Sequence, residues 1–108
     1  MVVDIQERDL LFHALSDATR RDIVRRAVGA AHSISDLAEA YPMSFAAVQK
    51  HVAVLERAGL VSKERQGRER LVRAEIGAIR SARSLLDDLE ALWRARVERM
   101  DEILDEGA

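Results

Sequence analysis

The chain has 108 residues, of which 48% are hydrophobic and 33% charged, with one proline, five glycines and no cysteine. This length fits one domain, which we place over residues 1–108, and the composition is typical of a folded globular protein rather than a disordered one. The absence of cysteine excludes disulfides, thiolate catalysis and cysteine-based metal sites. No apolar run approaches the roughly 20 residues of a membrane helix and no signal segment opens the chain, so we expect a cytoplasmic protein.

The charges are distributed unevenly along the chain. Residues 1–43 carry five basic and seven acidic side chains, residues 44–73 carry seven and three, and residues 74–108 carry five and nine. A basic segment between two acidic ones is typical of a surface that binds a polyanion, although a window of this size is more often a solvated surface. Charge alone therefore leaves both interpretations open.

Two helices are predicted before residue 30. Apolar residues recur every three or four positions after an acidic start, which predicts an amphipathic helix over about residues 4–14. Asp17 is placed to cap a second helix, because its carboxylate can accept the unpaired N–H groups of the first turn. Gly29 follows the last apolar residue of that helix and is predicted to cap its carboxyl end.

A helix-turn-helix is predicted over about residues 33–58. The first of its helices opens at Ser33 or Ser35 and must end before Pro42, which has no N–H to donate. Ser44 is the predicted cap of the second helix, and Gly59 ends it. The second helix is the longer and more basic of the two, as in DNA-binding helix-turn-helix units.

A β-hairpin is predicted directly after this unit. Residues 60–65 and 70–73 are short runs separated by residues 66–69, where Gly67 can adopt a positive φ angle. A hairpin in this position, spanning about residues 60–74, is the wing of a winged helix. The predicted fold is therefore mainly α with a two-stranded β-hairpin: a winged helix-turn-helix with long amino- and carboxyl-terminal dimerisation helices.

The last third of the chain is predicted to be one helix over about residues 75–105. Thirty helical residues span about 45 Å, whereas a compact chain of this length has a radius of gyration near 13 Å, so the helix extends beyond its own domain. A second copy of the chain is the expected cover for its apolar stripe; the alternative is a bend near residues 81–84 that folds the helix back. The predicted dimer interface comprises Leu85, Leu89, Leu92, Trp93, Val97 and Met100.

Three segments resemble the ArsR (arsenical-resistance repressor) family of bacterial winged-helix regulators. They are LSDATRRDIV at residues 15–24, ISDLA at 34–38 and MSFAAVQKHVAVLERAGLV at 43–61, and with the wing the resemblance covers about residues 8–75. Two positions depart from the family pattern: Ala18 stands where proline is usual, and Gln49 where serine is common. The resemblance implies a repressor that binds an operator.

The family's metal sites are not predicted here. One such site needs cysteines in the third helix, where this chain has residues 34–39 without any, and another needs histidines in the last helix, where residues 76–108 contain none. Carboxylates alone are poor ligands for zinc or nickel. We therefore expect no metal and no cofactor, and the chain resembles the branch that lacks metal sites, whose members include regulators associated with small hydrophobe-binding proteins.

The candidate DNA contacts lie on the fourth helix and the hairpin. Gln49 can bind adenine through two hydrogen bonds, and Lys50 can reach guanine or a phosphate, provided that this helix enters the major groove. The first turn of the helix can hold a phosphate or meet a thymine methyl group, and hairpin arginines can contact the backbone or the minor groove. The predicted DNA-binding residues are Ser44, Phe45, Ala46, Gln49, Lys50, Arg65, Arg68 and Arg70.

The sequence thus favours a homodimeric repressor that binds double-stranded DNA at an inverted-repeat operator. Two alternatives stay open: a regulator whose DNA affinity is controlled by a small hydrophobic effector at the dimer interface, and a protein-interaction module that binds DNA weakly. An enzyme is not expected, because the sequence has no phosphate loop, no metal-ligand spacing and no paired nucleophile and base.

Overall fold

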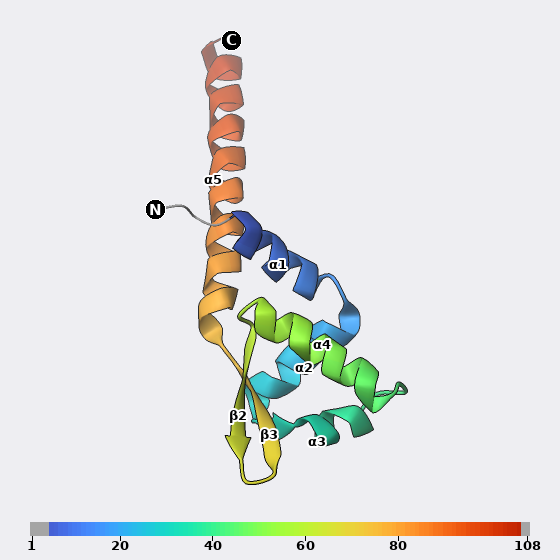
Figure 1. Ribbon diagram of the computed structural model, residues 1–108. Helices are drawn as coiled ribbons and strands as arrows, with labels where there is room; N and C mark the ends of the chain where they lie inside the picture. Colours follow the sequence, from blue (N-terminus) through green and yellow to red (C-terminus); the bar gives the residue numbers. More distant parts are fainter. Residues whose placement is uncertain (1–4, 107–108) are drawn as a thin grey trace.

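The computed structural model describes residues 5–106 (Figure 1). Four helices and a small sheet form the body of the molecule, and the last helix rises from this body as a long rod. The predicted start of the first helix at residue 4 lies outside the described residues. In chain order the elements are α1 (Ile5–Leu15), α2 (Ala18–Gly29), β1 (His32–Ser33), α3 (Ile34–Glu39), α4 (Phe45–Arg57), β2 (Val61–Gln66), β3 (Glu69–Ala74) and α5 (Ile76–Glu106).

The predicted amino-terminal caps of α2 and α4 are confirmed, and α3 begins at the first of its two candidates. In each case a side-chain oxygen accepts the backbone N–H three residues further on, at 3.0 Å for Asp17, 3.0 Å for Ser33 and 3.1 Å for Ser44. Each bond satisfies one of the N–H groups that a helix leaves without an internal partner. The chain therefore sets these three helix starts locally.

The two glycines predicted to end helices behave differently. Gly59 has φ +76°, and the Leu60 and Gly59 N–H groups donate to the carbonyls of Leu55 and Glu56, which together make a Schellman motif. Gly29, in contrast, is the last residue of α2, and the cap is Ala30 in an extended conformation. The prediction for Gly29 was wrong, because the chain leaves α2 directly toward a strand.

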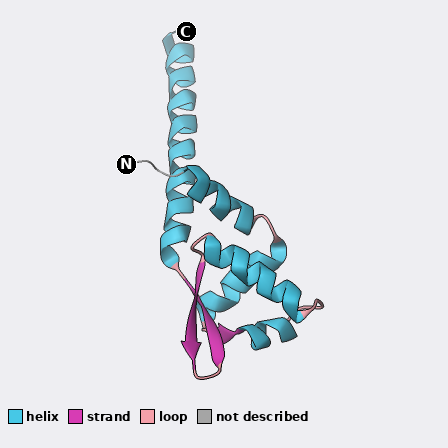
Figure 2. Cartoon of the chain, in the orientation of Figure 1, coloured by secondary structure: helices cyan, strands magenta, loops and turns pink. Residues whose placement is uncertain are grey.

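That strand makes the sheet three-stranded, with the order β1-β3-β2, where a two-stranded hairpin was predicted (Figure 2). In β1, His32 lies opposite Val72 and Ser33 opposite Leu71, antiparallel to β3. A strand of two residues is too short to show a period of two in the sequence. The edge strand ties the middle of β3 to the start of α3.

The hairpin is longer and its turn tighter than predicted. Val61 pairs with Ala74 at its base and Gln66 with Glu69 at its tip, which leaves a two-residue turn in place of the predicted four-residue loop. Gly67 adopts φ +63° at the first central position, as a type II′ turn requires. This turn matches the twist of the two strands.

The core lies where α2, α3, α4 and the sheet meet. Its largest fully buried side chains are Ile23, Leu37, Val48, Val52, Leu55, Leu60 and Val72. One residue, Glu75, joins the sheet to α5; its N–H donates to the Leu60 carbonyl at 2.9 Å, and its carboxylate accepts the Ser62 hydroxyl at 2.7 Å. The end of the hairpin and the start of α5 are thus fixed to each other.

Helix α5 runs without interruption for 31 residues, so the predicted alternative of a bend near residues 81–84 is wrong. The molecule accordingly measures 71 × 34 × 21 Å along its principal axes and has a Cα radius of gyration of 19.3 Å. Helix α1 packs against α5, and beyond this contact α5 projects freely (Figure 1). None of the helices between residues 5 and 106 combines the length and hydropathy needed to cross a bilayer.

Candidate nucleic-acid interface

The inner face of α4 fixes this helix to the body. Val48, Val52 and Leu55 are each 0% exposed, and they recur at the spacing of one helix face. Helix α4 packs against α1, α2, α3 and β2. Because these contacts fix its rotation about its own axis, they also decide which residues face outward.

The outer face carries the residues predicted to contact DNA. Ala46, Gln49 and Lys50 are exposed, and Phe45 in the first turn is 46% exposed rather than packed into the core. Within residues 5–106, no hydrogen bond or ion pair engages the side chain of Gln49 or Lys50. The hydroxyl of Ser44 is already used as the cap. The face is free to bind a ligand.

The hairpin presents a second basic surface. Arg65, Arg68 and Arg70 are all exposed, and Arg65 lies directly opposite Arg70 in the ladder. Of the two acidic residues of the hairpin, Glu64 pairs with Arg73 at 2.7 Å, and Glu69, between Arg68 and Arg70, forms no ion pair with another described residue. Like charges directly opposite one another on a sheet are unfavourable. The hairpin therefore concentrates positive charge at its tip without an acidic partner for these three arginines among the described residues.

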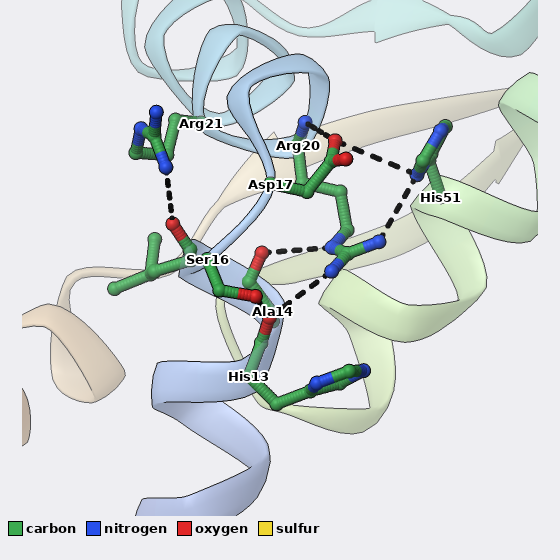
Figure 3. A network of polar contacts seen from close by, with 8 residues as sticks. His13, Ala14, Ser16, Asp17, Arg20, Arg21 and His51 are labelled. Carbon is green, nitrogen blue, oxygen red and sulfur yellow. Dashed lines mark hydrogen bonds and ion pairs between the residues drawn. The ribbon is translucent and has the colours of Figure 1, made fainter.

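The position of α4 is also set by a polar network at the junction of α1 and α2 (Figure 3). The guanidinium of Arg20 donates to the carbonyls of Ala14 at 2.8 Å and His13 at 3.0 Å, and its third contact, at 3.3 Å, is Nδ1 of His51 on α4. Because a guanidinium only donates, Nδ1 of His51 is the acceptor of this hydrogen bond in the tautomer that carries the ring proton on Nε2. The carboxylate of Asp17 lies 3.9 Å from the same nitrogen.

A second polar cluster holds the turn before α4. The hydroxyl of Tyr41 donates to Asp22 at 2.6 Å, Arg26 donates to the same carboxylate oxygen at 2.8 Å, and its guanidinium lies 5.5 Å from the centre of the tyrosine ring. Burial and the hydrogen bond to Asp22 raise the pKa of Tyr41 to about 12. The hydrogen bonds from Tyr41 and Arg26 lower the pKa of the Asp22 carboxyl.

Sequence reasoning missed both clusters. The guanidinium groups of Arg20 and Arg21 both bond main-chain carbonyl oxygens, and that of Arg21 bonds Leu15 at 2.8 Å. One signal was present in the sequence: His51 falls on the inner face of α4, where a polar ring needs a hydrogen-bonding partner. It did not reveal which partner that is.

The predicted dimer stripe of α5 lies largely in solvent. Leu85, near the body, is half-buried, whereas the more distal members are exposed by 54% for Leu89, 69% for Leu92, 64% for Trp93, 39% for Val97 and 54% for Met100. Ile103 and Leu104 continue the apolar surface with 66% and 69% exposure. Contiguous apolar surface of this kind marks an interaction site in a soluble protein.

Comparison with known proteins gives the family. A family model described as a helix-turn-helix domain matches residues 15–64. The HTH-type transcriptional regulator Rv2034 of Mycobacterium tuberculosis is 30% identical over 97 residues, which cover 90% of this chain and 88% of that protein. Both matches include α4 and the turn before it.

Solved structures agree with this result. An ArsR-like transcriptional regulator from Rhodococcus sp. RHA1 has 33% identity and a TM-score of 0.83, with 94% of this chain and 96% of that one covered. The homodimeric winged helix-turn-helix DNA-binding domain Mb0332 of Mycobacterium bovis, a possible ArsR-family regulator, shares the fold at 17% identity and a TM-score of 0.66, over 80% and 81% of the two chains. The family resemblance of the sequence motifs is therefore confirmed, and the chain belongs to the ArsR family of winged helix-turn-helix, DNA-binding transcriptional regulators.

Proposed function

We propose that the protein is a homodimeric repressor that binds an inverted-repeat operator, with one α4 helix in each of two successive major grooves and the hairpins on the flanking DNA. Such a dimer places its recognition helices about 34–36 Å apart, one helical turn of DNA. Repression follows where the operator overlaps a promoter, because the bound dimer excludes polymerase.

The hairpin tip is the observation that carries this proposal. Arg65 and Arg70 oppose each other in the ladder, and Arg68 occupies the turn. Of the two acidic residues of the hairpin, Glu64 is engaged by Arg73, which leaves Glu69 beside the three arginines at the tip. A DNA backbone, with one negative charge per about 1.7 Å of helix axis, relieves the repulsion between these arginines.

The outer face of α4 supplies the base contacts in this proposal. Gln49 reads an adenine and Lys50 binds guanine or a phosphate. In the first turn, Phe45 and Ala46 meet thymine methyl groups, and the backbone N–H groups after Ser44 face a phosphate. The exposed side chains of Gln49 and Lys50 form no hydrogen bond or ion pair with the rest of the described chain, so they can bind DNA without first breaking such a bond.

The exposed stripe of α5 supplies the homodimer contact. Closed two-fold dimers are the commonest assembly, and the homodimeric neighbour of the same fold is consistent with one here. The exposed apolar residues from Leu89 to Met100 become the core of this interface.

Fluorescence anisotropy at two salt concentrations tests the proposal, using duplexes from a randomised-site selection and a scrambled duplex. We expect one dimer per duplex, a specificity ratio of at least ~10³, and a log–log salt slope of about −0.9 per phosphate neutralised. Selection that returns no motif, with equally weak binding of both duplexes, contradicts the proposal and favours a protein-interaction module.

Three variants separate the assigned roles. Gln49→Ala changes the selected sequence, whereas Arg68→Ala lowers affinity for all duplexes and flattens the salt slope by about one phosphate. Lys50→Ala weakens all duplexes if it binds phosphate. Arg83→Ala is the matched control, because Arg83 lies on α5 with 82% of its side chain exposed and its loss removes the same charge. Uniform losses for Gln49→Ala across the library contradict its base-reading role.

A further inference from the structure

Three helices meet at the side chain of Arg20. It lies in the first turn of α2, and its three acceptors are two carbonyls of the last turn of α1 and Nδ1 of His51 in the middle of α4 (Figure 3). The backbone N–H of Arg20 is held in turn by Asp17 at 3.0 Å. The backbone of Arg20 is thus held by Asp17, and its guanidinium is held by three contacts.

The chemistry of the group makes this junction rigid. A guanidinium is planar, and its N–H groups form a fork of fixed geometry, so the positions of its acceptors depend on one another. The carbonyls of Ala14 and His13 belong to the negative end of the α1 dipole, which suits a cation. The His13 carbonyl also accepts the N–H of Ser16 at 3.1 Å and its hydroxyl at 2.6 Å. A shift of α4 along or away from α1 breaks at least one of the three bonds.

We infer that Arg20 is a positioning residue that transmits the orientation of the dimer helices to the DNA-reading helix. Helix α1 packs against α5, so the connection runs from α5 along α1 to the carbonyls of its last turn, then to Arg20, and from Arg20 to His51. His51 is adjacent to Lys50 in α4. The effect of Arg20 on DNA recognition rests on the proposed function. The contacts that join α1, α2 and α4 through Arg20 are present without DNA.

Arg21 provides a matched control for this role. Its guanidinium donates to the Leu15 carbonyl at 2.8 Å, so it also binds the end of α1, but among the described residues it forms no hydrogen bond or ion pair with α4. Replacing Arg20 or Arg21 by lysine keeps the charge and removes a forked donor near α1. Only the Arg20→Lys change also removes the connection to His51.

The orientation of α4 can be measured directly because the chain has no cysteine. Spin labels on Glu7→Cys in α1 and Ala53→Cys in α4, both exposed positions, report the distance between the two helices when labelled protein is diluted with excess unlabelled protein. We expect one narrow distance distribution for the parent and for Arg21→Lys, and a broader or displaced distribution for Arg20→Lys.

Variants of His51 test the same connection from the other side. His51→Asn keeps an acceptor near the position of Nδ1 and retains the narrow distribution, whereas His51→Leu removes the acceptor and reproduces the effect of Arg20→Lys. Rescue by asparagine is not expected if the ring only fills space. Identical distributions for Arg20→Lys and Arg21→Lys overturn the inference.

DNA binding gives the functional readout. On the duplex selected with the parent protein, Arg20→Lys lowers the ratio of specific to scrambled affinity by roughly tenfold, comparable to one mismatched base pair, while Arg21→Lys leaves this ratio unchanged. If the parent itself shows no specificity, the proposed function fails, and the distance distributions still decide the inference. Unchanged specificity for Arg20→Lys beside a displaced α4 also overturns it.

Discussion

Replacing Trp93 by alanine should weaken the homodimer strongly. Trp93 is 64% exposed, and full cover of this surface by a second copy removes roughly 160 Å² from water if the side chain totals about 250 Å². At about 25 cal/mol per Å² this corresponds to ~4 kcal/mol per protomer as an upper bound. Because association also orders side chains, we expect Trp93→Ala to destabilise the dimer by about 2–4 kcal/mol, a roughly 30- to 1,000-fold increase in Kd.

Sedimentation equilibrium measures this change, with Val28→Ala as the control. Val28 is 65% exposed on α2, so its truncation removes apolar surface of similar exposure away from the α5 stripe. Trp93 is the only tryptophan in the sequence, so in the parent protein its emission should shift to shorter wavelength as concentration rises and the ring is covered. Equal Kd values for the two variants, or emission that stays at the position of an exposed tryptophan throughout dimerisation, refute the reasoning.

The other predictions concern the fold that presents the interface. Tyr41 is the only tyrosine in the sequence, so phenolate absorbance in a pH titration reports this residue alone. We expect a titration midpoint near pH 12 rather than 10, and a midpoint near 10 contradicts the burial of Tyr41 and its bond to Asp22. Since the raised pKa favours the protonated phenol in the folded state, the stability from this bond is complete below pH 10 and lost as pH approaches 12, and Tyr41→Phe should lose about 1 kcal/mol at neutral pH in urea unfolding. Gly59→Ala should destabilise by about 1 kcal/mol because φ is positive, whereas Gly29→Ala should stabilise by about 0.5–1 kcal/mol; equal midpoints refute the difference. Leu55→Ala should lose about 2–5 kcal/mol, and a loss below 1 kcal/mol in the same assay contradicts its buried position.

The helices could be predicted because their signals are local. Asp17 and Ser44 cap helices through N–H groups only three residues away, and Gly59 ends α4 through bonds within the same turn. The family motif lies in the same helices. In α4, the spacing of apolar residues buries one face of the helix and leaves the opposite face exposed. Local sequence is therefore sufficient for the helix-turn-helix and for the candidate DNA-binding surface.

The features that escaped prediction all depend on distant partners. Arg20 and His51 are 31 residues apart, and Asp22 and Tyr41 are 19 apart, so no spacing rule links them. Strand β1 is recognisable only from its pairing with Val72 and Leu71. The angles at which α1, α2 and α4 cross decide which polar groups meet between the helices. These crossing angles cannot be read from a single sequence.

The single residue between the hairpin and α5 has a mechanical consequence. Strand β3 ends at Ala74 and α5 begins at Ile76, while Glu75 is held by the Leu60 carbonyl and the Ser62 hydroxyl. Because the joint consists of this one residue and two hydrogen bonds hold it, we expect the hairpin and α5 to move together as one body. In the proposed complex, one base pair added between the half-sites rotates the second half-site by roughly 35° about the DNA axis. A flexible joint between the hairpin and α5 would let the hairpin follow this rotation, whereas the joint held by Glu75 does not. We therefore expect the proposed dimer to accept only one half-site spacing.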